Sequence, residues 1–345
     1  MKIAILGNMN NVGFVLLRYL RVLGADADLL LYKSDGIGHS SHFIFESDSW
    51  EPEKWQPYVH QLPIANSYGS ALSNFLFIKI ILLLAYTVRK FLGSQNAHLT
   101  KPATKKEVRD FKNILSKYDC FIGSGSTPAI FEANNLKLDI FFPYSMGIEN
   151  FNEKFFFKLT KSKNIIVRLI ASKMRNLQRL GILNSKVSIN PDISWTKRAY
   201  EELGIKPVYV YPPHVFVEKP APEDYSKNLK DALKKIENFD YTLISHSRHQ
   251  WIKPSSLSEN EFLPINKNSD WLIRGFASYL EVSKKDALLV LFEYGIDYKN
   301  SKLLIQDLGI ENNIYWLPLM QRKEIMEIIK VCDVGVGEFY SDNVF

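Results

Sequence analysis

The sequence predicts an α/β protein built on parallel sheets. Short apolar runs of strand length alternate with amphipathic segments of helix length over most of the chain. Several of these apolar runs end in glycine or in short polar loops, as strands do where a fold of this class binds its ligand. At 345 residues, the chain is long enough for two domains.

The first part of the chain opens with a strand over residues 1–6, a Gly/Asn-rich loop over 7–13 and a helix over 14–23. The loop lacks the G-x-G-x-x-G spacing, so no nicotinamide site is assigned to it. The remaining strands are expected at 27–32, 118–122, 138–142, 186–188 and 208–211, and the remaining helices at 105–117, 196–203 and from Pro128.

The second part of the chain repeats the alternation more regularly. Strands are expected at 241–245, 287–295, 313–317 and 333–337, and helices at 226–236, from Lys267, at 301–308 and at 321–332. A segment rich in proline, lysine and aspartate precedes this part. The domain boundary is therefore predicted near residue 215, giving domains 1–215 and 216–345.

The loop after the strand at 241–245 is the strongest candidate binding site. It carries Arg248, His249 and Lys253, and Lys267 opens the next helix, which Asn268, Ser269 and Asp270 can cap. A basic loop beside a helix N-terminus suits a diphosphate, because the helix end adds N–H donors and partial positive charge. A solvated basic loop is the alternative interpretation.

Residues 241–345 resemble the nucleotide-sugar-binding half of a GT-B glycosyltransferase of the retaining group 1 family, a family 4-like enzyme. The resemblance rests on the S-R at 247–248, K-N-S-D-W-L-I-R-G-F-A from Lys267, L-V-L-F-E-Y-G ending at Gly295, D-L-G-I-E-N-N-I-Y-W-L-P-L-M and C-D-V-G-V-G. Residues 1–213 match only in outline. The resemblance implies two Rossmann-like domains facing a cleft.

The sequence departs from this family's pattern at three places. Asn268 follows Lys267 where the family has glycine, and Glu293-Tyr294-Gly295 replaces a Gly-x-Gly. Asn343 stands where a glutamate is usual, and the family's later elements would lie beyond Phe345. We therefore expect the second domain to be incomplete, as in a truncated chain, and the activity of such a chain is an open question.

The resemblance also implies roles for individual residues. It places Arg248, Lys267 and Gly13 at the donor diphosphate, although a plain tight turn is the alternative for Gly13. It places Gly295, Leu319, Met320 and Asn343 at the nucleotide or sugar. The loop at 123–128 has no histidine, so no catalytic residue is assigned. The family works without a metal, and we expect no cofactor.

Two segments predict contact with an anionic membrane. Residues 75–92 are the most apolar stretch, and their uncharged core is too short to span a bilayer. Residues 151–180 interleave large apolar side chains with Lys154, Lys158, Lys161, Lys163, Arg168, Lys173, Arg175 and Arg179. A buried helix and a solvated basic face are the respective alternatives.

The function expected from these observations is transfer of a sugar from a nucleotide diphosphate sugar to a saccharide or lipid-linked acceptor. It would serve cell-surface polysaccharide or glycoconjugate synthesis, in the cytoplasm or at the inner face of the membrane. The rivals are a catalytically inactive binding module, an epimerase or a phosphorylase. The net charge of +6 comes with no nucleic-acid motif, and the two distant cysteines do not suggest a metal site.

Overall fold

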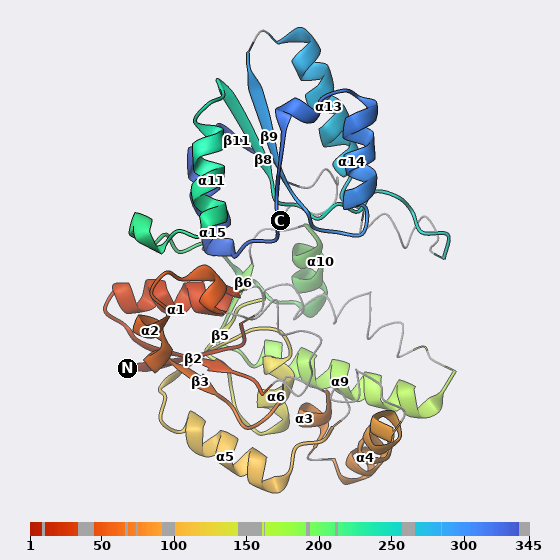
Figure 1. Ribbon diagram of the computed structural model, residues 1–345. Coiled ribbons are helices and arrows are strands. Elements are labelled where there is room, and N and C mark those ends of the chain that lie inside the picture. Colours follow the sequence, from red (N-terminus) through yellow and green to blue (C-terminus); the bar gives the residue numbers. More distant parts are fainter. Residues whose placement is uncertain are drawn as a thin grey trace. The chain divides into compact units, whose positions relative to one another are not determined.

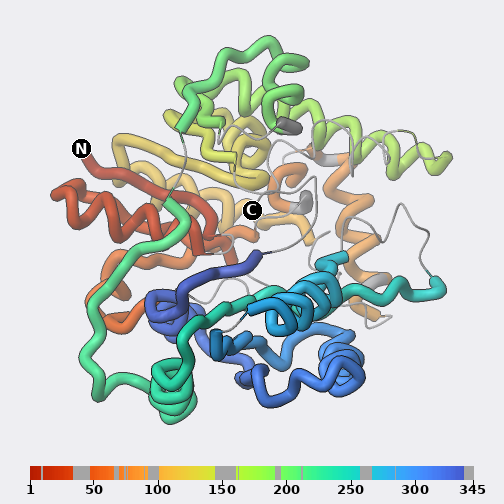
Figure 2. The backbone as a smooth tube through the Cα atoms, turned by 90° about the horizontal axis from the view of Figure 1, so that it is seen from above, coloured from red at the N-terminus to blue at the C-terminus, as the bar shows by residue number. Residues whose placement is uncertain are grey.

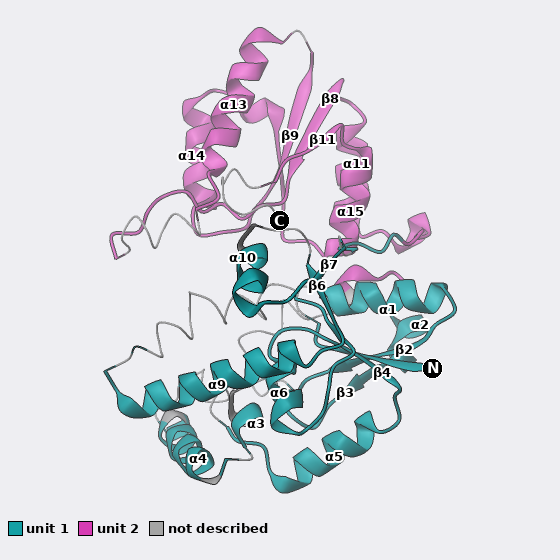
Figure 3. Ribbon diagram, turned by 180° about the vertical axis from the view of Figure 1, so that it is seen from behind, with its two compact units in different colours: residues 1–46, 51–217 teal, residues 47–50, 218–345 magenta. Residues whose placement is uncertain are grey.

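The computed structural model describes residues 1–8, 11–33, 45–65, 68–73, 75–91, 101–143, 161, 163–190, 194–210, 213–256, 266–283 and 285–337. The chain divides into two compact units, which Figure 3 colours separately. Unit 1 comprises residues 1–46 and 51–217, and unit 2 comprises residues 47–50 and 218–345. Each unit is described by itself.

Unit 1 contains a seven-stranded sheet in the order β3-β2-β1-β4-β5-β6-β7, and every recorded strand pair is parallel. The strands are β1 (Lys2–Leu6), β2 (Asp26–Leu31), β3 (Val59–Gln61), β4 (Cys120–Gly123), β5 (Ile140–Phe141), β6 (Val187–Asn190) and β7 (Val208–Tyr209). The helices are α1 (Val12–Val22), η3 (Phe45–Asp48), α2 (Pro52–Trp55), η4 (Gln56–Tyr58), α3 (Tyr68–Leu72), α4 (Leu76–Phe91), α5 (Lys105–Leu115), α6 (Thr127–Ala133), α9 (Ile165–Leu183) and α10 (Ser194–Leu203).

The sheet of unit 1 is covered on both faces, as the apolar strands require. Side chains alternate along β1, so that Ile3 and Ile5 pack with α1, whereas Ala4 and Leu6 pack with α5, α6 and α9. Figure 1 shows α1 and α2 on one side of the strands and α5, α6 and α9 on the opposite side. The reversal of strand order between β1 and β4 is the topological switch point of a Rossmann-like fold.

Unit 2 has a four-stranded parallel sheet in the order β10-β9-β8-β11. Its strands are β8 (Tyr241–Ser245), β9 (Ala287–Phe292), β10 (Ile314–Leu317) and β11 (Val334–Gly335). Its helices are η6 (Pro222–Asp224), α11 (Lys227–Ile236), α13 (Ser269–Val282), α14 (Tyr298–Asp307), η7 (Glu311–Asn313) and α15 (Arg322–Val331). Along β9, Leu289 and Leu291 face α13 and α14, and the alternate residues face α11 and α15. The predicted α/β class, with two Rossmann-like domains, is confirmed.

Residues 45–58 form three short helical turns, η3, α2 and η4. Within this stretch, residues 47–50 belong to unit 2. Glu218 accepts hydrogen bonds from Ser49 Oγ (2.9 Å) and Trp50 N (2.6 Å), and Lys323 Nζ donates to the Ser49 carbonyl (2.9 Å). These contacts join residues far apart in sequence, so no local pattern could have predicted them.

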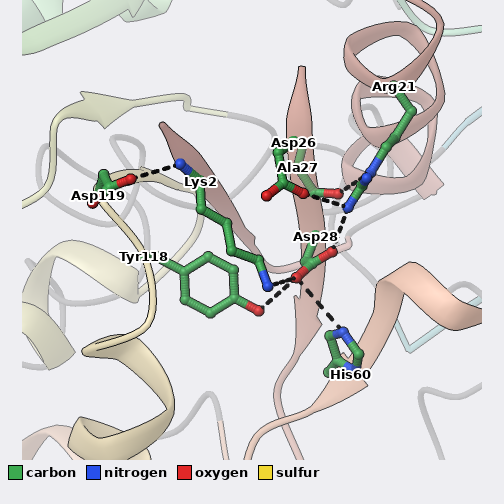
Figure 4. A network of polar contacts seen from close by, with 8 residues as sticks. All are labelled: Lys2, Arg21, Asp26, Ala27, Asp28, His60, Tyr118 and Asp119. Atoms are coloured by element: carbon green, nitrogen blue, oxygen red, sulfur yellow. Dashed lines mark hydrogen bonds and ion pairs between the residues drawn. The ribbon is translucent and has the colours of Figure 1, made fainter. Parts of the chain in front are cut away.

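The amino-terminal half of the unit 1 sheet carries a buried ionic network, shown in Figure 4. The Asp28 carboxylate contacts Lys2 Nζ (3.0 Å), Arg21 Nη2 (2.8 Å) and the Tyr118 hydroxyl (2.9 Å). Burial alone would raise the pKa of Asp28, but the hydrogen bonds from Lys2, Tyr118 and Arg21 lower it overall. The network ties α1 and the segment before β4 to β2, and its charges neutralise one another, so it is structural.

Helix α4 was expected to be either buried or at a membrane, and it is buried on one face only. Leu82 lies in the core, whereas Phe77, Ile80, Leu84, Val88 and Phe91 are exposed, from 51% for Ile80 to 90% for Phe91. Their spacing of three or four residues places them on one side of the helix. A purely buried helix is therefore the wrong interpretation. Figures 1 and 2 show α4 (orange) beside the start of α9 (yellow-green).

Candidate functional site: the carboxyl edge of the unit 2 sheet

The carboxyl ends of the parallel strands of unit 2 gather most of the predicted site residues. Arg248 follows β8, Gly295 follows β9, and Leu319 and Met320 follow β10. Because the strands are parallel, their carboxyl ends lie at one edge of the sheet. β8 lies at the switch point of this sheet, between β9 and β11, where α/β folds bind ligands.

The loop after β8 is fixed by the segment after β9. His249 N donates to the Tyr294 carbonyl (2.7 Å), and Asp297 N donates to the His249 carbonyl (3.0 Å). The buried carboxylate of Asp297 accepts from the backbone N–H groups of Trp251 (2.9 Å) and Ile252 (3.0 Å). Four bonds thus anchor the residues that follow Arg248, which reduces the entropy that a ligand contact would otherwise have to overcome.

Gly295 is the point of closest approach between these two segments. Its φ of +107° is a conformation that residues with a side chain rarely adopt. A Cβ at this position would lie 2.3 Å from the His249 carbonyl oxygen and 2.4 Å from the His249 nitrogen. The single glycine left by the Glu-Tyr-Gly sequence is therefore required for packing the loop.

His249 fills the space beneath the loop. Its side chain is 1% exposed, Nδ1 lies 2.9 Å from Ser301 Oγ, and its ring packs against Trp316 at 5.1 Å between centroids. The same Ser301 hydroxyl accepts a hydrogen bond from Trp251 Nε1 (2.9 Å). His249 Nε2 has no hydrogen-bond partner among the described residues. Burial lowers the pKa of His249 to about 4, against a smaller raising effect of Asp297, so the imidazole is neutral near pH 7.

The pKa of His249 predicts a pH-dependent stability of unit 2. An unfolded chain protonates this histidine near pH 6.5, and the folded chain does so only near pH 4. Between these values the unfolded state binds more protons, so the free energy of unfolding falls as the pH drops, by roughly 3 kcal/mol in all. Denaturant unfolding from pH 7 to 4.5 should show this loss in the wild type and a smaller one in His249→Gln.

The matched control is His246→Gln, because His246 lies in the same loop but is exposed. Comparison of the two variants isolates the part of the pH dependence that belongs to His249. Equal slopes in the wild type and in His249→Gln would show that His249 is not buried as a neutral group.

Lys267 and Arg248 lie at opposite ends of a loop that closes at the N-terminus of α13. Lys267 N donates to the Gln250 carbonyl (2.7 Å), and Ser269 Oγ makes a long hydrogen bond to the Arg248 carbonyl (3.5 Å). Both residues are half-buried. The backbone of Arg248 and Lys267 thus lies beside the N-terminus of α13, whose first-turn N–H groups and partial positive charge favour an anion.

The start of α13 differs from the expectation in two ways. The helix begins at Ser269, two residues after Lys267, and its N-cap residue is Asn268, whose side chain makes no capping hydrogen bond. Asn268 adopts φ +47°, the left-handed conformation that asparagine tolerates better than other residues with a side chain. Asparagine is therefore compatible with the left-handed turn that precedes α13.

Leu319 and Met320, the second and third residues after β10, have different surroundings. Leu319 is exposed, whereas Met320 packs against the core cluster that contains Leu317 and Ile328. Asn343, the last candidate at this edge, lies outside the described residues, as do residues 35–42 and 151–160. The described candidates at one edge of unit 2 are therefore Arg248, Lys267, Gly295, Leu319 and Met320.

Gly13 belongs to the carboxyl edge of the sheet in unit 1. With Gly7, Gly123 and Ser124 it lines a small pocket at the switch point between β1 and β4. A Cβ on Gly13 would lie 2.3 Å from the Gly7 carbonyl oxygen, so tight packing of the turn alone accounts for this glycine. The buried Asn8 side chain accepts from Phe14 N (2.9 Å) and thereby caps the first turn of α1.

Sequence reasoning missed three side chains that organise these two edges. In the sequence, His249 and Asp297 are only two polar residues of loops. Their contact joins the loop after β8 to the loop after β9. Gln178, in α9, is buried; it donates to the Gly125 carbonyl (2.9 Å) and accepts from Ala129 N (3.1 Å). A lone glutamine in a basic amphipathic helix gives no local signal of such a role.

Within the described ranges, no group of three or more His, Cys, Asp or Glu side chains is placed to hold a metal ion. Cys120 and Cys332 are free and half-buried. Burial raises the pKa of Cys332 to about 11, which disfavours the thiolate form that metal binding or nucleophilic reaction requires. No helix among the described residues is both long and apolar enough to cross a bilayer.

No protein-family model and no curated protein sequence matches this chain. Among solved structures, HepE of Anabaena in complex with UDP is 14% identical with a TM-score of 0.49, covering 97% of this chain and 73% of HepE. The lipopolysaccharide outer core galactosyltransferase WaaB is 12% identical with a TM-score of 0.46, covering 96% and 71%. Sucrose-phosphate synthase of Thermosynechococcus elongatus is 12% identical with a TM-score of 0.45, covering 100% and 77%. Similarities of this size carry no argument about function. The fold is therefore assigned from the strand order, and a function can be proposed only from the chain's own residues.

Proposed function

We propose that this chain is a glycosyltransferase of the GT-B type that uses a nucleotide diphosphate sugar as donor. One observation carries the proposal. Arg248 and Lys267 flank the N-terminus of α13 at the carboxyl edge of a parallel sheet, on a loop held by the hydrogen bonds of His249 and Asp297. Two full charges and a helix end suit the two phosphates of such a donor.

In the proposed reaction, these groups stabilise the negative charge that develops on the departing diphosphate. A guanidinium can grip two phosphate oxygens at once, and a lysine supplies a compact charge, so Arg248 and Lys267 divide orientation and neutralisation between them. Retention of anomeric configuration and independence from a metal are part of the proposal and rest on the sequence resemblance. On the same resemblance, Gly13 is proposed for the diphosphate, and Gly295, Leu319, Met320 and Asn343 are proposed for the nucleotide or the sugar.

A thermal-shift series with UDP, GDP and ADP, and with their common sugars, tests the donor class. A ligand that binds only the folded state raises the melting temperature, by an amount that grows with the ratio of ligand concentration to Kd. We expect one base to raise it selectively. A rise without any sugar transfer in an activity assay would favour the inactive binding module, and no rise with any nucleotide would remove the transferase proposal.

The acceptor is proposed to be lipid-linked, which would place the chain at the inner face of the cell membrane and in cell-surface polysaccharide synthesis. The exposed face of α4 supports this, together with the exposed Ile165, Ile166 and Leu169 near the start of α9. Exposed cations at Lys163 and Arg168 accompany the apolar residues of α9. Contiguous exposed apolar side chains bordered by cations favour an anionic membrane as the partner.

Flotation with vesicles tests the membrane contact. We expect binding to phosphatidylcholine vesicles that contain an anionic lipid, weaker binding to pure phosphatidylcholine, and a loss of binding as salt increases. Leu84→Gln/Val88→Gln should weaken flotation about tenfold or more, because each apolar side chain contributes about 1.5 kcal/mol or more on burial. Trp271→Gln, which removes an exposed aromatic side chain of unit 2, is the control. Equal flotation of wild type and double variant would exclude α4 as the contact.

A further inference from the structure

A groove in unit 1 concentrates positive charge. It has a volume of about 520 Å³ and lies between α4 and α5. The described residues that line it are Ser73, Lys79, Ala103, Lys105, Val108, Arg109, Lys112 and Asn113. Half of these residues are cations and none is an acid.

The positions of the cations make this more than a random surface distribution. Lys105, Arg109 and Lys112 follow one another at spacings of four and three residues, so they share one face of α5. Lys79 reaches the same groove from α4. Like charges at such spacings repel, which destabilises a helix by a few tenths of a kcal/mol per pair unless an anion lies between them.

The protein itself supplies little of that negative charge. Arg109 Nε lies 3.7 Å from the Asp110 carboxylate, with both side chains exposed. No described carboxylate lies within 4.0 Å of the amino groups of Lys79, Lys105 or Lys112. The Glu107 carboxylate is engaged in the capping box of α5, where it accepts from Thr104 N (2.7 Å). The groove therefore presents three lysines and one arginine to solvent.

The groove also adjoins exposed apolar surface of α4. Lys79 lies in the groove, and Leu83, one helical turn later on the same side of α4, is exposed. Ala103 and Val108 add apolar surface to the groove lining itself. A ligand with an anionic head and an apolar tail could place the head among the cations and the tail along α4.

We propose that this groove binds the phosphate group of a phosphate-bearing lipid. Arginine and lysine are the side chains that bind phosphate through charge-assisted hydrogen bonds. Four of them in one groove carry more positive charge than a ligand with a single carboxylate would neutralise. The groove would orient unit 1 on the membrane and select headgroups with accessible phosphate. The inference rests on the membrane contact in the proposed function but not on sugar transfer.

The test compares two triple variants that remove equal charge. Lys105→Gln/Arg109→Gln/Lys112→Gln removes the α5 face, and Lys227→Gln/Lys230→Gln/Lys234→Gln removes three exposed lysines of α11 in unit 2. Glutamine is nearly as good a helix former as lysine or arginine, so both variants should fold. Flotation uses phosphatidylcholine vesicles with phosphatidic acid, whose phosphate is terminal, or with phosphatidylglycerol at equal surface charge.

We expect the α5 variant to bind phosphatidic acid vesicles at least tenfold more weakly than the wild type, and the α11 variant less than twofold more weakly. The α5 variant should lose less on phosphatidylglycerol. Equal losses in the two variants, or equal losses on the two lipids, would overturn the site, because diffuse attraction would then explain binding. No loss in the α5 variant would also overturn it.

Two further measurements separate the sources of phosphate and the two proposals. Inorganic phosphate and glycerol 3-phosphate are titrated against the wild type by calorimetry. Binding that the α5 variant abolishes would identify a soluble phosphate ester as sufficient, and no binding would leave the lipid as the source. The nucleotide thermal shift of the α5 variant should equal that of the wild type. A wild type that floats selectively but binds no nucleotide would refute the transferase and not the groove.

Discussion

Gly295→Ala should destabilise unit 2 by about 2 to 5 kcal/mol and abolish nucleotide binding. The added methyl group would lie 2.3 Å from the His249 carbonyl oxygen, and the φ of +107° is unfavourable for alanine. The backbone penalty is about 1 to 2 kcal/mol, and displacing a hydrogen-bonded backbone segment adds about 1 to 3 kcal/mol. Two bonds between the segments, His249 N to Tyr294 O and Asp297 N to His249 O, would be strained at the same time.

Substitutions of two other glycines of unit 2 allow the backbone penalty and the steric penalty to be measured separately. Gly309 has φ +67° but open space around its Cβ position, so Gly309→Ala should cost about 1 kcal/mol through the backbone alone. Gly275 lies within α13 in open space, so Gly275→Ala should stabilise by about 0.5 to 1 kcal/mol. Calorimetric melting, with hydrogen exchange at β8 and β9 to identify the transition of unit 2, measures all three. If Gly295→Ala resembled Gly309→Ala, the two segments would not be in contact.

The strands of unit 2 could be predicted because their signal is local. β8 has the predicted bounds of 241–245, and β9 and β10 begin at or within one residue of expectation. Each is an apolar run flanked by polar residues, buried by helices that the same alternation predicts. The parallel order then follows from the connections, since short strands joined by helices form parallel sheets.

The interior of the candidate site could not be predicted, because its contacts join residues that are distant in sequence. His249 reads as one more polar residue of a basic loop, and only its contacts with Ser301 and Trp316 identify it as a buried neutral imidazole. Gly295 reads as the remainder of a Gly-x-Gly, whereas the fold requires it for packing against His249. The left-handed φ of Asn268 is likewise set by the turn that precedes α13.

The exposure of α4 was ambiguous for a different reason. A helix that is apolar nearly all round satisfies both a buried position and a membrane-facing one, and periodicity alone does not separate them. The structure separates the faces: Ile78 and Leu82 pack against the core, and Ile80 and Leu84 do not. The sequence therefore identifies α4 as an apolar helix, but only the structure shows which of its side chains are exposed.

Arg248→Ala and Lys267→Ala should each weaken binding of the nucleoside diphosphate about 10- to 100-fold, and the double variant by roughly 1,000-fold. A hydrogen bond to a charged group contributes about 1.5 to 3 kcal/mol, and both side chains are proposed to contact the same diphosphate. Arg248→Lys should recover only part of the loss, because lysine keeps the charge but not the planar pair of donors. Isothermal titration calorimetry at fixed salt measures these affinities.

The nucleoside without phosphates makes this prediction specific. Its affinity should be nearly the same for the wild type and for all three alanine variants, because the clamp touches only phosphate oxygens. Arg274→Ala and Lys227→Ala remove exposed cations elsewhere in unit 2 and should leave both affinities unchanged. A variant that lost nucleoside and nucleoside diphosphate equally would have a disturbed fold. Unchanged diphosphate binding in the double variant would remove Arg248 and Lys267 from the donor site, and with them the observation on which the transferase proposal depends.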